Sequence, residues 1–312
     1  MRKAALLYNP ESGGSGQRLR ELQSALTILR GGGVDSELLP TDSPQHAGAE
    51  ARKAIASGAD TIFACGGDGT IHNIVQVLAG TQIALAVLPM GTANALAHDL
   101  GIPLHIPAAA EAALRGKTRR IALGRITCQN LNGDENSRYF IVAAGIGVDA
   151  HLFYKLHSGS KKRLGMGAYY AKAWQLWFSY PMTRFRVTYA DGSGVQNDAD
   201  VTELMAVRIR QFGGVIQELA PGASLDRDDV RLVLCRTSSR IAYLAYVTRG
   251  LLRQRWNVPG IDLASSTKVA CEYSDMSEGR RNIYVEADGE LVGTLPVEIT
   301  VVPDALTVLA PQ

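Results

Sequence analysis

The sequence predicts two structural parts: a doubly wound α/β domain over about the first 126 residues, then a β-sandwich. Up to residue 126, apolar β-forming runs alternate with helical patterns, whereas the rest is dominated by short strand-like runs between Gly, Asp and Pro turns. Repeated strand–helix units favour a parallel sheet with right-handed crossovers and helices on both faces. A chain of 312 residues is long enough for two domains of ordinary size.

In the first half, strands and helices are expected to alternate regularly. Its strands are predicted at residues 4–8, 34–39, 61–65, 83–88 and 120–126, and its helices at residues 19–29, 47–57, 71–78, 108–114 and in a stretch that ends near Gly101. The first helix shows Leu19, Leu22, Leu26 and Leu29 on one face, and three glycines at residues 31–33 stop it.

The second half reads mainly as antiparallel strands. They are predicted at residues 138–143, 183–189, 201–208, 230–235, 267–273, 283–287, 297–302 and 306–309. Two helical insertions are expected, around residues 164–179 and 241–253.

Composition excludes several classes of protein. The net charge of +2 gives no overall field for nucleic acid, so no nucleic-acid partner is expected. The four cysteines lie far apart without a Cys-x-x-Cys pair, which argues against a zinc site and fits a reducing compartment. The apolar run before Asn9 is too short for a signal peptide, and the chain is interpreted as a soluble cytoplasmic protein.

A strand–turn–helix unit around Gly66-Gly67-Asp68-Gly69-Thr70 is the strongest local signal. Glycines let backbone N–H groups approach a phosphate, and a helix N-terminus favours negative charge. Asp68 would repel phosphate unless a cation lay between them, which suggests Mg²⁺. The alternative from this stretch alone is a βα turn in which Asp68 or Thr70 caps the helix.

Four strand-to-helix loops should meet at one edge of the predicted sheet, because open α/β sheets bind ligands at the carboxyl ends of their strands. These loops are residues 13–16, 41–43, 66–70 and 91–94, and three of them contain glycine beside small hydroxyl or amide side chains. Together they suggest a nucleotide phosphate site. Neither the Gly-x-x-x-x-Gly-Lys-Ser/Thr loop nor the Gly-x-Gly-x-x-Gly fingerprint is present.

Three segments resemble the signature loops of the diacylglycerol kinase catalytic superfamily, which includes bacterial lipid kinases and the sphingosine and ceramide kinases. They are Asn9-Pro10-Glu11-Ser12-Gly13, Gly66-Gly67-Asp68-Gly69-Thr70 and Pro89-Met90-Gly91-Thr92-Ala93-Asn94-Ala95-Leu96-Ala97. NAD kinases share the Gly-Gly-Asp-Gly loop, but the third segment is similar to lipid kinases and not to them.

The resemblance continues in the second half, in the segment from Ala143 to Ala150, in Gly213-Gly214 followed by residues 220–226, and in residues 286–306. It implies a phosphofructokinase/NAD kinase-like first domain over residues 1–126, rejoined by the last strand at about residues 300–312. It also implies a lipid-substrate β-sandwich over residues 127–299, with the nucleotide between the domains.

The resemblance also assigns residues to ATP and Mg²⁺. The implied nucleotide contacts are Asn9, Pro10, Ser12, Gly13, Gly14, Thr41, Gly66, Gly67, Asp68, Gly69, Thr70, Gly91, Thr92 and Asn94, with Asp68 also linked to Mg²⁺. Asp149 is expected to face the lipid headgroup. The alternative is that Asp149 has a structural role in a turn or a helix cap.

Asp288-Gly289-Glu290 is the candidate for the proton acceptor that phosphoryl transfer needs. By itself the pattern indicates an ordinary hairpin, because Asp-Gly is a favoured turn pair. The resemblance instead places the catalytic carboxylate in this block, with Glu290 as the first choice of general base and Asp288 as the second.

Three departures from the bacterial branch concern a second, structural Mg²⁺ network: Gly14, Ala95 and the Asp226-Arg227-Asp228 triplet. Arg227 would put a fixed positive charge at the ion's position, whereas Asp226 and Asp228 keep a weaker metal site open. Residues 94–97 resemble the sphingosine kinase form of the loop, which leaves the substrate open.

One segment suggests contact with a membrane surface. Lys161-Lys162-Arg163 precedes a predicted helix with Tyr169, Tyr170, Trp174, Trp177 and Phe178, and basic residues beside aromatics can dock on anionic lipid. From pattern alone, a packed helix with a solvated basic start is the alternative.

We therefore expect an ATP- and Mg²⁺-dependent lipid kinase acting on a hydroxyl of a membrane lipid, with diacylglycerol as the first choice and phosphatidic acid as its product. A sphingoid or other lipid kinase, an NAD kinase-like enzyme and an inactive nucleotide-binding regulator are the alternatives. The expected location is cytoplasmic, peripheral to the inner face of the membrane, and a homodimer is compatible with this interpretation.

Overall fold

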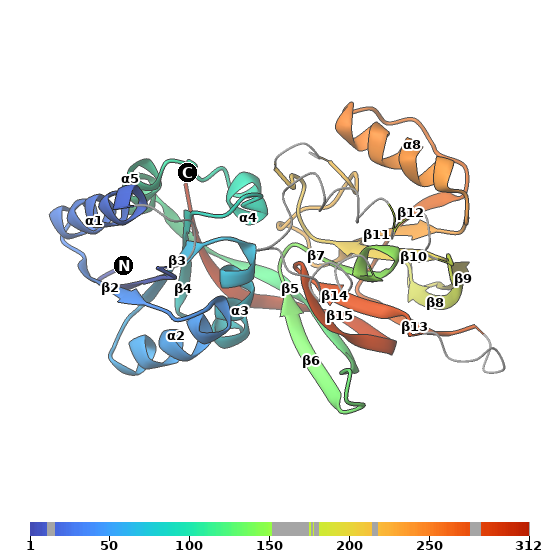
Figure 1. Ribbon diagram of the computed structural model, residues 1–312, viewed down its shortest axis with the longest axis horizontal. Coiled ribbons are helices and arrows are strands. Elements are labelled where there is room, and N and C mark those ends of the chain that lie inside the picture. The colour runs from blue at the N-terminus through green and yellow to red at the C-terminus, as the bar shows by residue number, and fades with distance from the viewer. Residues whose placement is uncertain are drawn as a thin grey trace.

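The protein is described from a computed structural model, shown in Figure 1. The structure describes residues 1–10, 16–151, 175, 177, 181–213, 218–274 and 282–311.

The N-terminal part is a parallel sheet between two layers of helices, which confirms the predicted doubly wound α/β domain. Its strands β1 (Lys3–Tyr8), β2 (Asp35–Pro40), β3 (Thr61–Gly66) and β4 (Ala84–Pro89) lie in the order β4-β3-β1-β2. Helices α1 (Gly16–Gly31) and α5 (Ile106–Arg115) lie on one face, and α2 (Ala47–Ala56) and α3 (Asp68–Leu78) on the other (Figure 1). The short helices η1 (Pro44–His46) and α4 (Ala95–Asp99) complete this part.

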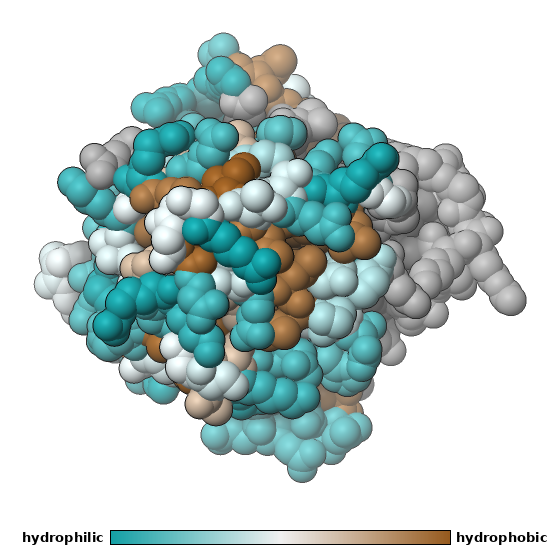
Figure 2. All heavy atoms as spheres, turned by 90° about the vertical axis from the view of Figure 1, so that its left-hand side faces the viewer, coloured by the Kyte–Doolittle hydropathy of each residue, from teal (hydrophilic) through white to brown (hydrophobic). Residues whose placement is uncertain are grey.

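The central strands β3 and β4 are buried at every residue, which explains their continuous apolar sequences. A parallel sheet covered by helices on both faces selects such runs instead of an alternating pattern. Helix α3 contributes Ile71, Ile74, Val75 and Leu78 to the same core. Seen from this end of the molecule, the outer surface is largely hydrophilic, with apolar atoms between the polar side chains (Figure 2).

The C-terminal part is built from antiparallel strands and one described helix, α8 (Arg240–Leu251), which confirms the predicted β-rich domain. One series of paired strands runs β12 (Ile261–Ser266), β11 (Val230–Cys235), β10 (Glu203–Val207), β7 (Ala143–Gly147), β14 (Tyr284–Ala287). The others are β5 (Lys117–Gln129), β6 (Glu135–Phe140), β8 (Phe185–Ala190), β9 (Gln196–Val201) and β13 (Lys268–Tyr273). A second apolar core that includes Phe140, Phe185 and Leu204 lies within this part.

The last strand, β15 (Glu290–Ala310), belongs to both parts. It leaves a hairpin with β14, pairs with β5 along most of its length, and ends parallel to β4, with Thr307 opposite Ala84. Figure 1 shows this strand in red, running from the sandwich into the first sheet. The two halves therefore share a continuous strand, and the hairpin at its start is held at a defined position relative to the β3 and β4 loops.

Some elements differ from the sequence-based prediction. Residues 138–143 form the ends of two strands, β6 and β7, because the backbone N–H groups of Ile141 and Val142 bond to the Asp288 carboxylate instead of a neighbouring strand. Residues 297–302 and 306–309 belong to one strand, interrupted only by a register shift before Leu306. The polar strand β9 and the strand β12 were not predicted, and the predicted helix at 164–179 lies outside the described residues apart from 175 and 177.

Candidate active site

The loops after β3 and β4 are in direct contact at the carboxyl edge of the sheet. The Met90 N–H donates to the Gly66 carbonyl at 3.0 Å, and a Cβ on Gly91 would lie 2.5 Å from the Gly67 Cα. Neither Gly67 nor Gly91 can gain a side chain unless the two loops separate. Gly66 also lacks this room, because a Cβ there would meet the Thr70 hydroxyl. The sequence-predicted convergence of these two loops is therefore present in the structure.

Asn94 shapes the β4 loop from within. It adopts a left-handed backbone with φ of 49°, its Oδ1 accepts the Gly91 N–H at 2.8 Å, and its Nδ2 donates to the Gly91 carbonyl at 2.9 Å. Arg18 of α1 donates to the Met90 carbonyl at 3.1 Å and links the first helix to this loop. The Asn94 amide is thus occupied by its own loop, which leaves backbone groups and exposed Thr92 to face a ligand.

Asp68 begins α3 and ties it to α4. Its Oδ1 accepts the Ala95 N–H at 3.0 Å. Burial raises the pKa of Asp68, and the nearby Asp288 carboxylate acts in the same direction. A carboxylate whose charged form is disfavoured in this way gains from a neighbouring cation.

The loops at the first two strands are described in part. The Thr41 N–H and hydroxyl donate to the Tyr8 carbonyl, at 2.7 Å and 3.3 Å, so Thr41 closes the ends of β1 and β2. Asn9, the residue after Tyr8, is buried, whereas Pro10 is exposed. Ser12, Gly13 and Gly14 lie outside the described residues.

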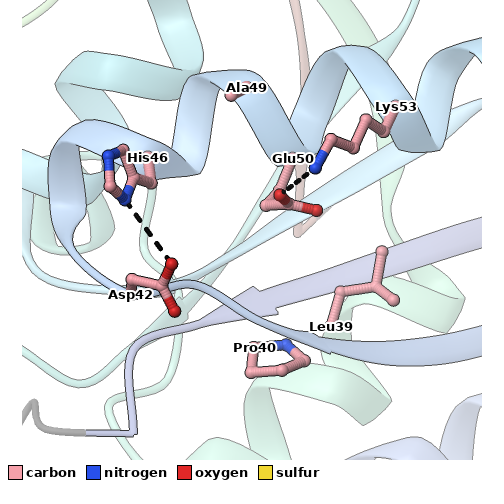
Figure 3. A pocket seen from close by; sticks show the side chains of 7 residues that line it. All are labelled: Leu39, Pro40, Asp42, His46, Ala49, Glu50 and Lys53. Atoms are coloured by element: carbon pink, nitrogen blue, oxygen red, sulfur yellow. Dashed lines mark hydrogen bonds and ion pairs between the residues drawn. The ribbon is translucent and has the colours of Figure 1, made fainter.

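A pocket of about 450 Å³ lies between the end of β2 and helix α2 (Figure 3). Its walls combine apolar and charged side chains: Leu39, Pro40, Asp42, His46, Ala49, Glu50 and Lys53. Asp42 and His46 approach to 3.8 Å, and Lys53 donates to Glu50 at 2.7 Å.

Asp288 and Glu290 lie at opposite ends of a tight turn and have different surroundings. Asp288 and Gly289 both have positive φ, 50° and 82°, as the two-residue hairpin predicted for Asp-Gly requires. The Asp288 side chain is fully buried and accepts the N–H groups of Ile141, Val142 and Ala143 at 3.0, 2.8 and 3.2 Å. It therefore holds the β6–β7 junction in place and has no access to an acceptor hydroxyl.

His72 is a site residue that the sequence reasoning did not identify. It lies one turn after Asp68 on the buried face of α3, and its Nδ1 is 3.3 Å from Oδ2 of Asp288. This contact joins α3 of the first domain to the turn that carries Asp288 and Glu290. The available signal was a polar side chain at an apolar position of α3, and it did not reveal the partner.

Glu290 faces the N-terminus of α3. An ideal Cβ on Gly69 would lie 3.0 Å from Oε1 of Glu290, so the absence of a side chain at Gly69 leaves room for the carboxylate. Glu290 is partly exposed, unlike Asp288. The structure thus places one accessible carboxylate against the glycine loop that carries Asp68.

Comparison with known proteins identifies the family. Residues 3–126 match the diacylglycerol kinase catalytic domain, and residues 141–310 match the YegS C-terminal NAD kinase β-sandwich-like domain. The chain belongs to the diacylglycerol kinase family. It is 30% identical to a diacylglycerol kinase of Bacillus subtilis over 96% of this chain and 93% of that protein. It is 31% identical to one of Mycobacterium tuberculosis H37Rv over 99% of this chain and 96% of that protein.

Solved structures show the same fold. A diacylglycerol kinase from Bacillus anthracis aligns with a TM-score of 0.71 and 19% identity, covering 99% of this chain and 96% of that one. Yeast NADH kinase in complex with NADH aligns with a TM-score of 0.50 and 10% identity, covering 100% of this chain and 84% of that one. This family of kinases uses a nucleotide, which agrees with the glycine loops described above.

In this diacylglycerol kinase family member, the partly exposed Asp149 forms a group of three carboxyls with the buried Glu203 and Glu286. Its carboxylate lies over Gly145, where a Cβ would clash with it. Glu203 accepts the N–H groups of Val148 and Asp149, at 2.5 and 3.3 Å, and Glu286 accepts the Gly289 N–H at 2.7 Å. Burial raises the pKa of all three groups, and the charge of Asp149 raises those of Glu203 and Glu286 further.

The second metal site considered at Asp226 and Asp228 is not supported by the geometry. Asp226 is ion-paired with Arg119 and lies 4.0 Å from Arg210. A buried guanidinium, that of Arg208, lies close to this triplet. It donates to the carbonyls of Arg227, Asp229 and Ala122. Within the described ranges, no three His, Cys, Asp or Glu side chains are grouped to hold a metal ion.

Proposed function

We propose that this diacylglycerol kinase family member is an ATP- and Mg²⁺-dependent lipid kinase that phosphorylates diacylglycerol to phosphatidic acid. The observation that carries the proposal is the meeting of Glu290 with Gly69 at the N-terminus of α3, beside Asp68. An accessible carboxylate from the second half of the chain there faces a loop suited to a nucleotide phosphate. This arrangement has the two parts that phosphoryl transfer to a hydroxyl requires.

The nucleotide phosphates are assigned to the loops after β3 and β4. Their touching glycines expose backbone, and α3 directs its free N–H groups toward the same edge. The pocket beside β2 lies two strand spacings from β3, which is about 10 Å, so we assign the base end of the nucleotide to it.

The side chains present fit a Mg²⁺ ion that arrives with the nucleotide. Mg²⁺ commonly binds one or two carboxylates together with phosphate oxygens and water. Asp68, whose pKa is raised by burial, offers one such carboxylate, and the described residues contain no complete protein cage. When bound, the ion would neutralise charge on the phosphates, and Asp68 would hold it at the start of α3.

Glu290 is proposed as the general base. It accepts the proton of the attacking hydroxyl, while the buried Asp288 positions the turn through its bonds to residues 141–143. Asp149 is proposed to line the headgroup side, since it lies two residues after the end of β7 and is partly exposed.

The proposal is tested by incubating the purified chain and Mg²⁺ with γ-labelled ATP and, in separate reactions, diacylglycerol, a sphingoid base and NAD. We expect label in phosphatidic acid, formed about 10²- to 10⁴-fold more slowly when Glu290→Gln replaces the parent. If label appears on the sphingoid base or on NAD, that molecule and not diacylglycerol is the substrate. Absence of label from all products, with ATP still bound, would leave a nucleotide-binding regulator.

A further inference from the structure

Helix α8 is apolar on its outward face, the reverse of an ordinary surface helix. Six of the eleven exposed large hydrophobic side chains in the described residues lie between Ile241 and Trp256. These are Ile241 (79% exposed), Leu244 (39%), Val247 (37%), Leu251 (38%), Leu252 (58%) and Trp256 (43%). Those within α8 and its C-cap repeat at helical spacing, so they form one stripe, which we call the α8 stripe.

The inward face of the same helix carries its polar anchors. Tyr246 donates its hydroxyl to the Leu219 carbonyl at 2.6 Å, and the Tyr243 hydroxyl lies 2.7 Å from that of Thr202. Arg249 is buried over the Tyr246 ring. Two tyrosines and an arginine therefore face the protein while isoleucine, leucine and valine face outward. Figure 1 shows α8 in orange at the edge of the C-terminal domain, on the far side from α1 and α2.

The segment of chain that carries the stripe has charges of one sign. Residues 236–260 contain five arginines and neither lysine, aspartate nor glutamate, a formal charge of +5 against +2 for the whole chain. Arg253 and Arg255 follow the last apolar residues of the stripe, and both are exposed. Arg255 lies 3.7 Å from the Glu218 carboxylate, and its side chain is 77% exposed. Apolar side chains bordered by arginine and a tryptophan suit the interface of an anionic bilayer.

The α8 stripe is also connected to the carboxyl group assigned to the headgroup. Thr202, which contacts Tyr243, directly precedes Glu203, and Glu203 accepts the Asp149 N–H. Tyr243 also packs against the small apolar cluster that includes Val148, the neighbour of Asp149 in the sequence. Lipid held at α8 would therefore lie on the side of the molecule where the Asp149 segment is anchored.

We infer that the α8 stripe, with Arg253 and Arg255, is the surface that docks this protein on an anionic lipid bilayer. The inference deepens the proposed function and rests on it for the identity of the partner. No helix in the described residues is long and apolar enough to cross a membrane. Docking by an interfacial helix would bring the protein to a lipid substrate without one.

The test is co-sedimentation of the full chain with vesicles of phosphatidylcholine, alone or mixed with phosphatidylglycerol, without nucleotide. We expect binding to the mixed vesicles that weakens as salt is raised. Combined Ile241→Ser, Leu244→Ser and Leu252→Ser should weaken it about tenfold or more. Arg253→Glu should weaken it about fivefold or more at low salt.

Matched variants control for general effects. Combined Leu104→Ser, Leu131→Ser and Val195→Ser removes side chains of similar exposure away from α8 and should leave vesicle binding within about twofold of the parent. Arg138→Glu reverses the charge of an exposed arginine outside residues 236–260 and should likewise leave vesicle binding within about twofold of the parent. Melting temperature and nucleotide binding confirm that each variant is folded.

Equal vesicle binding by the parent and the α8 variants would overturn the inference. So would loss of binding only on replacing Lys161, Lys162 and Arg163, which lie outside the described residues. If the α8 variants instead change a dimer into a monomer in sedimentation velocity and leave vesicle binding unchanged, the stripe is a subunit interface. Because vesicle binding is measured without transfer, failure to phosphorylate lipid would contradict the proposed function and leave this result standing.

Discussion

Gly69 and Glu290 contact each other across the two halves of the chain, with Oε1 of Glu290 3.0 Å from the position of a Cβ on Gly69. Gly69→Ala should push the carboxylate aside and lower kcat by about 10- to 100-fold, because small displacements of catalytic groups are costly. Gly69 is helical, so alanine should keep or raise the free energy of unfolding by about 0.5–1 kcal/mol. Steady-state kinetics and urea unfolding measure both effects. If Gly69→Ala is as active as the parent, Glu290 does not act at this site.

The two carboxylates of the turn should separate catalysis from stability. Glu290→Gln should lower kcat by about 10²- to 10⁴-fold with little change in unfolding, since it removes a proton acceptor from a partly exposed position. Asp288→Asn should lower the free energy of unfolding by about 1–3 kcal/mol, because an amide cannot accept three backbone N–H groups as a carboxylate does. The opposite pattern, a stable but inactive Asp288→Asn and an active Glu290→Gln, would exchange their roles.

Features that depend on neighbouring residues could be predicted from the sequence, whereas contacts between distant segments could not. The Asp-Gly turn, the glycine loops after β3 and β4 and the position of Asp68 at a helix start follow from local residue chemistry, and the structure has each of them. The Asp288 bonds to residues 141–143 and the His72 contact join segments far apart in the sequence, so no local pattern contains them. The same applies to Asp226, which the triplet suggested as a metal ligand and which pairs with Arg119. The outward apolar face of α8 required burial to be known.

Asp68 should be needed for transfer but not for folding. Asp68→Asn keeps an oxygen for the Ala95 N–H and removes the charge beside the phosphates. We expect kcat to fall by about 100-fold or more, and Mg²⁺ dependence of nucleotide binding to weaken, because one carboxylate contact to the ion is lost. Titration of nucleotide at several Mg²⁺ concentrations measures the second effect. Unchanged Mg²⁺ dependence in this variant would contradict the proposed ion contact.

The buried carboxyls should make stability fall as pH rises. The pKa of Glu203 lies well above its ordinary value of 4.5 in the folded protein, so the folded state retains a proton that the unfolded chain releases. Above pH 4.5, stability therefore decreases through this window, by at most about 1.4 kcal/mol per pH unit for one group. Glu203→Gln should flatten the dependence, because glutamine does not titrate. Urea unfolding at several pH values checks this, and identical slopes in parent and variant would refute it.

Arg208 should take the part of a structural cation. Arg208→Met leaves the carbonyls of Arg227, Asp229 and Ala122 without this donor and should cost about 1–3 kcal/mol. Arg208→Lys should not restore the loss, because an ammonium lacks the planar fork. Chelation of divalent ions should leave the parent's melting temperature unchanged in the absence of nucleotide. A chelator-induced fall in melting temperature would show that a structural metal is bound after all.

The most direct measurement is transfer of label from γ-labelled ATP into a total lipid extract presented as vesicles, by the parent and by Glu290→Gln at equal concentration. We expect one labelled lipid, phosphatidic acid, from the parent and a rate about 10²- to 10⁴-fold lower from the variant. Equal rates from both would contradict the role of Glu290. If the parent binds ATP but labels no lipid, the proposed lipid kinase activity is contradicted.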